Sequence, residues 1–202
     1  MALAHAGLEY ELREVSLKQK PPQMLALSSK GTVPVLQLET RVIDESLEII
    51  AWALNQAGSA HSNPAHSNSD SWAEADFPHP LVEANDGEFK YYLDRYKYFE
   101  RFPEHPQSYY LDKCMTFLND LEERLTQAEY LLGAKICWVD VAIFPFIRQF
   151  AFVDKIVFDD LALPMLQNWL DRRLGSELFS SAMIKHPFWQ EGQAGLYSNS
   201  PP

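Results

Sequence analysis

One polar segment near the end of the first third of the chain constrains the fold more than any other feature. Residues 58–80, GSAHSNPAHSNSDSWAEADFPHP, are rich in Ser, Asn, Ala and Pro, a composition typical of a linker with little structure of its own. Short apolar runs precede this segment, and long helical periodicity follows it. The sequence therefore predicts two parts, 1–57 and 81–202, joined by a linker at 58–80.

The first part is predicted to be a small mixed α/β unit. Residues 9–17 alternate apolar and polar side chains, as a strand does, and two prolines then open a short helix in QMLALSS. Two short strands are expected at 33–38 and 41–43. Residues 45–56 place apolar side chains at helical spacing, and Gly58 ends that helix.

The second part is predicted to be all helical. Residues 108–132 form a long amphipathic segment, and residues 137–153 are almost wholly apolar, so this second segment should lie inside a bundle. Pro145 within it removes one backbone hydrogen bond and should bend the helix. A helix at 164–174 and a short one after Gly175 follow, and the tail, 192–202, is expected to fray.

Composition argues against several classes of function. The formal net charge of −11 makes nucleic acid or an anionic membrane surface an unfavourable partner, because both carry phosphate. No apolar run reaches the roughly 18 residues that a membrane helix needs, and the N-terminus lacks the features of a secretory signal. His61 and His66 have no further ligands at metal-binding spacing, so we expect no metal site. With two cysteines and no CxxC, we place the protein in a reducing cytoplasm.

The segment KGTVPVLQLETRVIDES, from Lys30 to Ser46, is the most informative about function. Pro34 comes just before a predicted strand, which leaves two interpretations open. A trans proline could start an edge strand. Alternatively, a cis bond between Val33 and Pro34 would turn the N–H and C=O of Val33 outward, where they could pair with an extended ligand peptide.

Glu45 and Ser46 stand where the following helix begins. Ser is a preferred N-cap, and free N–H groups at a helix start attract a carboxylate, whereas Glu45 could accept from an ammonium group. The pair therefore suits an amino-acid head group that carries both charges. An ordinary cap beside a surface acid is the simpler interpretation of the pair taken alone.

In combination, these motifs resemble a known family. KGTVPVL followed by IDES resembles the glutathione-binding half of the glutathione S-transferase superfamily, and DVAIFPF resembles the core helix of its second domain. The match looks closest to bacterial members, including omega-like ones. The resemblance implies an α+β fold, with a thioredoxin-like N-terminal domain followed by an all-α helical bundle domain. It also implies a homodimer that uses glutathione as co-substrate.

The resemblance assigns a role to each residue of the motif. Val33 would pair through its backbone with the cysteinyl part of glutathione, and Pro34 would be cis. Glu45 and Ser46 would hold the γ-glutamyl end. Lys30 would reach the glycyl carboxylate, a task that suits a flexible point charge.

The start of the family pattern has no counterpart in this sequence. Members begin with a strand, a turn that carries a catalytic Ser, Cys or Tyr, and the first helix, whereas MALAHAGLEY resembles only the last turns of that helix. We therefore expect the first strand and the catalytic turn to be missing, and the chain to be a fragment of a longer protein. No catalytic residue is assigned within it.

Cys137 and Asp140 are predicted to cap a helix rather than to react. They stand three residues apart in ICWVD, the spacing of a capping box, and Ile136 and Val141 are placed to form a hydrophobic staple around it. Cys114 falls on the apolar face of its predicted helix, so it is expected to pack in the core.

An aromatic group on one predicted helix leaves a further choice open. Its members could pack in the core, or the exposed ones could line an apolar pocket for a hydrophobic co-substrate; they are Tyr91, Tyr92, Tyr96 and Phe99. In the family this helix borders the electrophile pocket and the dimer contact.

The leading hypothesis for function is a glutathione-dependent transferase or thiol-exchange enzyme acting on a hydrophobic electrophile. The alternatives are a non-catalytic protein of the same fold that acts by interaction, as stringent starvation proteins do, and an inactive fragment.

Overall fold

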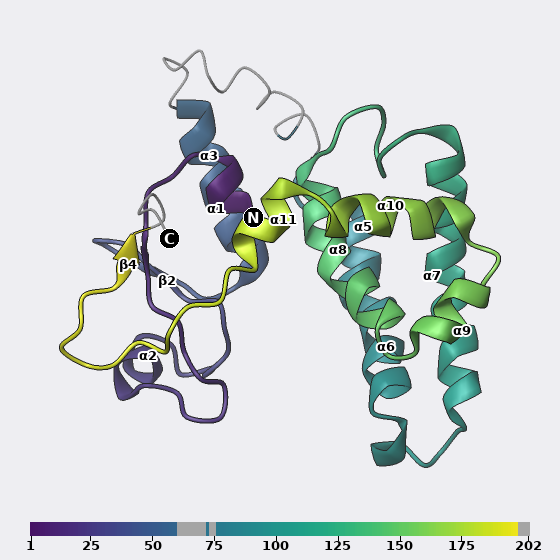
Figure 1. The fold of residues 1–202 in the computed structure, drawn as a ribbon, viewed down its shortest axis with the longest axis horizontal. Coiled ribbons are helices and arrows are strands. Elements are labelled where there is room, and N and C mark those ends of the chain that lie inside the picture. The colour runs from purple at the N-terminus through teal and green to yellow at the C-terminus, as the bar shows by residue number, and fades with distance from the viewer. Residues whose placement is uncertain (60–71, 73–75, 198–202) are drawn as a thin grey trace. The chain divides into compact units, whose positions relative to one another are not determined.

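The computed structural model describes residues 1–59, 72 and 76–197, and the chain forms two compact units (Figure 1). Unit 1 comprises Met1–Ser69 and Glu177–Pro202, and unit 2 comprises Asp70–Ser176. Compactness does not establish which segments fold independently, so the boundaries expected from the sequence stay a prediction. His61 and His66, in the expected linker, lie outside the described residues.

The described residues of unit 1 combine helices with two small antiparallel sheets. Its helices are α1 (Ala2–His5), α2 (Pro22–Leu27), α3 (Ser46–Ser59) and α11 (Glu177–Ala182). Its strands are β1 (Glu11–Leu12), β2 (Leu36–Gln37), β3 (Val42–Ile43) and β4 (Leu196–Tyr197). Strand β1 pairs with β4, and β2 pairs with β3, in register Leu36 with Ile43.

Segments near the two ends of the described chain pair in this unit, so residues 196–197 of the expected frayed tail form a strand. Residues 198–202 of that tail lie outside the described residues. Leu196 and Tyr197 pair with β1, and the backbone N–H of Trp189 donates to the carbonyl of Glu14 at 2.7 Å. The predicted strand at 9–17 is reduced to Glu11–Leu12. Alternating polarity shows which residues are able to form a strand, but the number that do so depends on the length of the partner.

The regular elements of the described part of unit 2 are all helices. Its elements are α5 (Pro80–Ala84), a π-helical turn η2 (Asn85–Phe89), α6 (Lys90–Lys97), a 3₁₀ turn η3 (Phe99–Arg101), α7 (Gln107–Gln127), α8 (Trp138–Ala151), α9 (Lys155–Asp160) and α10 (Pro164–Leu174). The predicted long helices are present, and the bounds of α10 are those that the sequence predicted. Helix α8 continues through Pro145.

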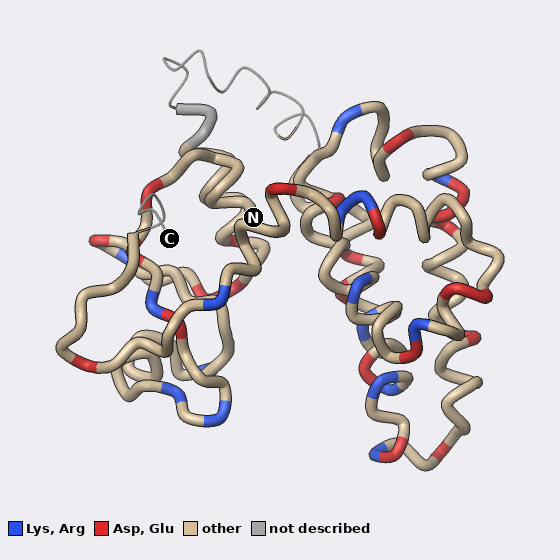
Figure 2. The backbone as a smooth tube through the Cα atoms, viewed as in Figure 1, with Lys and Arg blue, Asp and Glu red and all other residues tan. Residues whose placement is uncertain are grey.

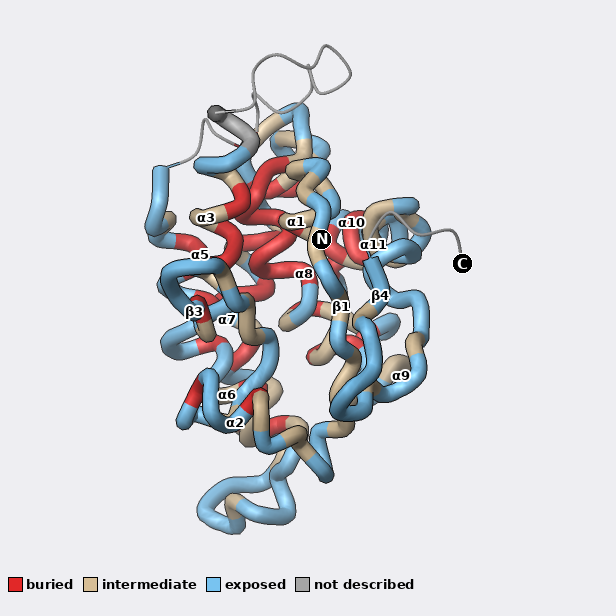
Figure 3. Tube along the Cα trace, turned by 90° about the vertical axis from the view of Figure 1, so that its left-hand side faces the viewer, coloured by how far each residue is buried: buried red, intermediate tan, exposed pale blue. Residues whose placement is uncertain are grey.

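The core of unit 2 is built around α8, whose buried residues show as red in Figure 3. Trp138, Ile143 and Ile147 on α8 and Trp169 on α10 have no exposed surface. The apolar face of α7 packs beside them with the expected spacing; its buried residues are Tyr110, Cys114, Phe117, Leu118, Leu121 and Leu125. Burial raises the pKa of the Cys114 thiol to about 12, consistent with a packing role.

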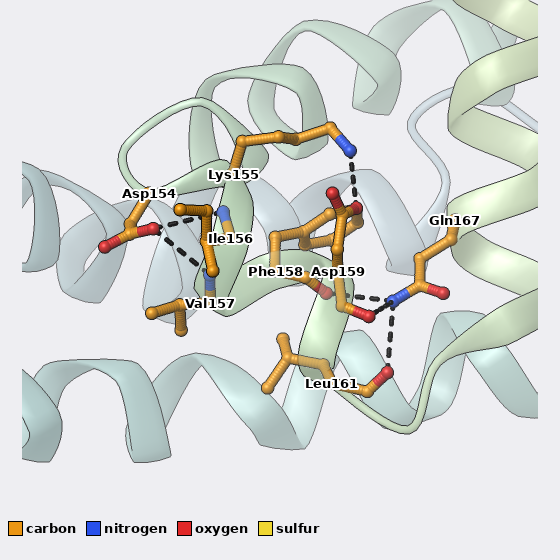
Figure 4. Close-up of polar contacts among 8 residues, drawn as sticks. All are labelled: Asp154, Lys155, Ile156, Val157, Phe158, Asp159, Leu161 and Gln167. Carbon is orange, nitrogen blue, oxygen red and sulfur yellow. Dashed lines mark hydrogen bonds and ion pairs between the residues drawn. The ribbon is translucent and has the colours of Figure 1, made fainter.

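The short helix α9 is fixed at both ends by side chains (Figure 4). Asp154 caps its start, accepting from the N–H groups of Ile156 and Val157, each at 3.1 Å. At its end, the amide nitrogen of Gln167 donates to the carbonyls of Phe158, Asp159 and Leu161. Because a helix of six residues is marginal alone, these caps supply partners that its own backbone cannot.

Lys and Arg are interspersed with Asp and Glu along the trace of each unit (Figure 2). Among the described helices, none combines the length and apolar composition that crossing a membrane requires. The described residues also include no cluster of three or more His, Cys, Asp and Glu side chains suited to a metal ion.

Candidate ligand-binding site

The β2–β3 hairpin brings two separate parts of the informative motif to one end of a sheet. Because Leu36 pairs with Ile43 in an antiparallel ladder, the residues just before β2 and just after β3 leave the hairpin at the same end. The candidate residues lie there, and all are exposed: Lys30, Val33, Pro34, Glu45 and Ser46. They form an open surface rather than an enclosed cavity.

The Val33–Pro34 peptide bond is cis, the second of the two interpretations that the sequence left open. The side chain of Val33 is 45% exposed. Among the described residues, neither its N–H nor its C=O has a hydrogen-bond partner. Since backbone polar groups are normally paired, these two groups are available to an extended peptide.

The start of α3 differs by one residue from the sequence-based expectation. The N–H of Ile49 donates to the carbonyl of Glu45 at 3.0 Å, which makes Glu45 the N-cap and Ser46 the first helical residue. No side chain among the described residues accepts from the N–H groups of Ser46, Leu47 or Glu48. The free donors expected at this end are therefore present, but the Ser46 hydroxyl does not provide the cap.

Lys30 lies between two carboxylates. Its Nζ is 2.6 Å from Glu45 Oε1 and 2.9 Å from Asp44 Oδ1. Hydrogen bonds to Glu45 first, and to Asp44 second, raise the pKa of the Lys30 ammonium group. The expected cation is thus beside the expected acid, and the two groups form an ion pair.

Asp44 and Ser28 belong to this site although the sequence analysis did not single them out. The hydroxyl of Ser28 donates to Asp44 Oδ2 at 2.6 Å, and Ser28 is buried. The Ser28 hydrogen bond, followed by that from Lys30, lowers the pKa of Asp44. The contact joins residues 16 positions apart. In the sequence, the one feature that could have indicated it is that Asp44 is an acid next to Glu45.

Cys137 and Asp140 form both halves of a capping box at the start of α8. The N–H of Cys137 donates to Asp140 Oδ2 at 3.1 Å, and the Cys137 thiol lies 3.3 Å from the same oxygen. Burial, reinforced by the Asp140 charge, raises the pKa of Cys137 to about 12. A thiol with this pKa is almost wholly protonated at neutral pH, so it is a poor nucleophile.

The aromatic group on α6 and η3 is divided by burial. Tyr96 is buried and lies 5.1 Å, between ring centroids, from Phe150, so it packs in the core. Tyr91 is 50% exposed and Phe99 is 38% exposed, and Tyr92 is intermediate. The exposed members are accessible for contact with a ligand or a second chain.

A hollow of about 490 Å³ is lined by residues of unit 2, whereas the candidate residues all belong to unit 1. It lies beside the end of α7 and the turn that follows, and Asp120, Arg124 and Leu132 are among the residues lining it. The open surface at the β2–β3 hairpin, rather than this hollow, therefore remains the candidate site.

Comparison with protein families relates this geometry to known proteins. A model of the N-terminal domain of glutathione S-transferases matches residues 1–56. A model of their C-terminal domain matches residues 71–172, half of the chain. No curated protein sequence matches significantly.

Solved structures share the fold at low sequence identity. Poplar glutathione transferase F1 has a TM-score of 0.70 and 16% identity, over 90% of this chain and 88% of that chain. BphK, described as a bacterial GST, has a TM-score of 0.65 and 24% identity, over 90% of both chains. A third structure is a glutathione transferase family member from Pseudomonas fluorescens, determined with two glutathione bound. It has a TM-score of 0.64 and 20% identity, over 87% of this chain and 82% of that chain.

These likenesses confirm the predicted fold class, a thioredoxin-like N-terminal domain followed by a helical C-terminal domain. Because a family model covers half of the chain, the chain belongs to the glutathione S-transferase family.

Proposed function

We propose that this protein binds glutathione at the end of the β2–β3 hairpin. The proposal rests on the exposed Val33, whose backbone N–H and C=O have no partner among the described residues. The start of α3, whose first N–H groups also lack a partner there, leaves the hairpin at the same end. Glutathione is an extended peptide with an amino-acid head. Its cysteinyl part would pair with Val33 next to Pro34, and its γ-glutamyl end would rest on Glu45 and Ser46, with Lys30 serving a carboxylate.

We further propose that the bound thiol reacts, as a thiolate, with a hydrophobic electrophile or a disulfide. Of the described thiols, Cys114 and Cys137 are both buried and both have pKa values raised to about 12, so neither is assigned to the chemistry. The described residues are assigned the role of binding and orienting the tripeptide. Because the described residues are assigned to binding alone, a second candidate is also favoured: a protein of this fold that binds glutathione and catalyses no reaction.

Glutathione-agarose retention followed by two assays separates these functions. We expect the protein to be retained and to be released by free glutathione, and the variant Glu45→Ala to lose retention. Conjugation of 1-chloro-2,4-dinitrobenzene and reduction of a mixed disulfide then test for the two reactions. Retention without either reaction would favour the binding protein, and failure of retention would overturn the proposal.

The remaining features of the proposal follow from the family and from surface composition. We propose a homodimer, with the exposed Tyr91 and Phe99 available at the contact, and sedimentation velocity would detect it. A cytoplasmic location is supported by the two free thiols, since reducing compartments keep cysteines unpaired. Membership of an omega-like bacterial subclass stays a prediction.

A further inference from the structure

The Lys30 side chain contacts the acid that the proposed ligand needs. Its Nζ lies 2.6 Å from Glu45 Oε1, the carboxylate proposed to receive the amino group of glutathione. A lysine ammonium and a ligand ammonium are equivalent donors to a carboxylate, since each is a compact cation with three N–H groups. Two ammonium groups held on one carboxylate would repel each other, so the two compete for Glu45.

The two acids beside Lys30 are not held equally. Asp44 accepts a second hydrogen bond, at 2.6 Å, from the buried hydroxyl of Ser28, and its side chain is 26% exposed. The Glu45 carboxylate is 57% exposed, and among the described residues Lys30 is its sole partner. Lys30 can therefore leave Glu45 while it keeps its contact with Asp44.

We infer that Lys30 is a specificity-determining residue, which occupies the amino-group position on Glu45 until a ligand carboxylate draws it away. The inference rests on the proposed function. A ligand with both an amino group and a distal carboxylate exchanges partners with the Lys30–Glu45 pair, so that no charge is left unpaired. A ligand without the distal carboxylate must displace Lys30 unaided, and it binds more weakly.

The substitution Lys30→Met separates this role from simple anchoring. Removing the ammonium group frees Glu45 for the ligand amino group, which raises affinity. It also removes the cation that pairs with the distal carboxylate, which lowers affinity. For glutathione, which has both groups, the two effects offset each other. We expect the affinity for glutathione to change by less than about twofold. The affinity for glutathione amide, in which a neutral carboxamide replaces the glycyl carboxylate, should rise about threefold, the scale of one exposed ion pair. If Lys30 were only an anchor, the variant would bind glutathione more weakly and glutathione amide with unchanged affinity.

Isothermal titration calorimetry of both peptides, at low ionic strength to limit screening, measures the four affinities. Lys30→Arg should restore the wild-type preference, and Lys18→Met, at another exposed lysine of unit 1, serves as the control for net charge. A variant that binds glutathione more weakly and glutathione amide with unchanged affinity would overturn this inference and leave the proposed function standing. Binding of neither peptide by any of these proteins would overturn both.

Discussion

Asp140 illustrates what a single residue can carry in this fold. Its carboxylate is fully buried and accepts from the N–H of Leu131 at 3.1 Å, the N–H of Cys137 at 3.1 Å and the indole of Trp169 at 2.9 Å. The spacing in ICWVD predicts only the Cys137 contact, because a capping box is local. The other two join α8 to a turn and to α10, which no sequence window contains.

The structure therefore predicts a larger effect at Asp140 than the roughly 1 kcal/mol expected for loss of a cap. Asp140→Ala leaves three buried donors without a partner, and we expect it to lower the free energy of unfolding by about 3 kcal/mol or more. Urea denaturation measures this value. Asp120→Ala, which removes an exposed ion pair with Arg124, is the control and should cost less than about 1 kcal/mol. A similar cost for both variants would contradict this account of Asp140.

The two thiols give a second prediction at this scale. Because Cys114 and Cys137 are buried and both have pKa values of about 12, neither should react with iodoacetamide in the native protein at neutral pH. Both should react once the protein is unfolded in urea, as mass spectrometry would show. Rapid native labelling of Cys137 would reopen its assignment as a structural residue.

Only part of the candidate site could be predicted from the sequence, because contacts between residues far apart in the chain leave no local pattern. Lys30, Val33, Pro34, Glu45 and Ser46 follow from a motif in one short segment. The support of Lys30 by Asp44 and Ser28 depends on how α2 and β3 pack, so it is visible only in three dimensions.

At the scale of elements, helices followed from the sequence more closely than strands did. The amphipathic period of α7 and the long apolar run of α8 identify each helix from its own residues. The strand predicted at 33–38 forms a ladder only at Leu36–Gln37, because a strand needs a partner, and β3 supplies two residues.

His79, at the start of α5, gives this scale a pH-dependent prediction. Its Nδ1 accepts from the N–H of Leu81 at 3.2 Å, which requires an unprotonated nitrogen. Burial, and then the charge of Arg124, lower the pKa of His79, while Asp76 opposes them. Because the folded pKa is below the unfolded one, near 6.5, His79 protonates more readily in the unfolded chain.

The unfolding free energy should therefore decline as pH falls below about 6.5 and level off below the folded pKa. His79→Asn keeps a capping oxygen that does not titrate, so we expect it to show a smaller decline between pH 7 and 5. His186→Asn, at a histidine of intermediate exposure, is the control. Equal slopes for the wild type and His79→Asn, measured by urea denaturation across this range, would count against the cap.

At the scale of the whole molecule, unit 1 is closed by the far end of the chain. We term residues 189–197 the C-terminal strap. The guanidinium carbon of Arg13 lies over the Trp189 ring, 4.9 Å from the ring centroid. The N–H of Gly195 donates to Glu11 Oε1 at 2.9 Å. This last contact spans 184 residues. Composition alone indicates a loose tail, since pairing over such a distance leaves no local pattern.

Gly195 is the residue at which the strap can be tested. A Cβ there would lie 2.4 Å from both Cγ and Oε1 of Glu11, so Gly195→Ala must move the Glu11 side chain away from the N–H that it accepts from. The loss of this hydrogen bond should weaken the attachment of the strap to β1. We expect faster hydrogen exchange at the amides of Leu12 and Leu196 and unchanged exchange in α8, which belongs to unit 2.

Two further variants of the strap separate steric conflict from loss of the hydrogen bond. Glu11→Ala in the Gly195→Ala background removes the crowding, so exchange in the double variant should match that of Glu11→Ala alone. Ala194→Ser, at an exposed neighbouring position, should leave exchange unchanged. Equal protection of β1 and β4 in the wild type and in Gly195→Ala would mean that the Glu11 contact does not hold the strap.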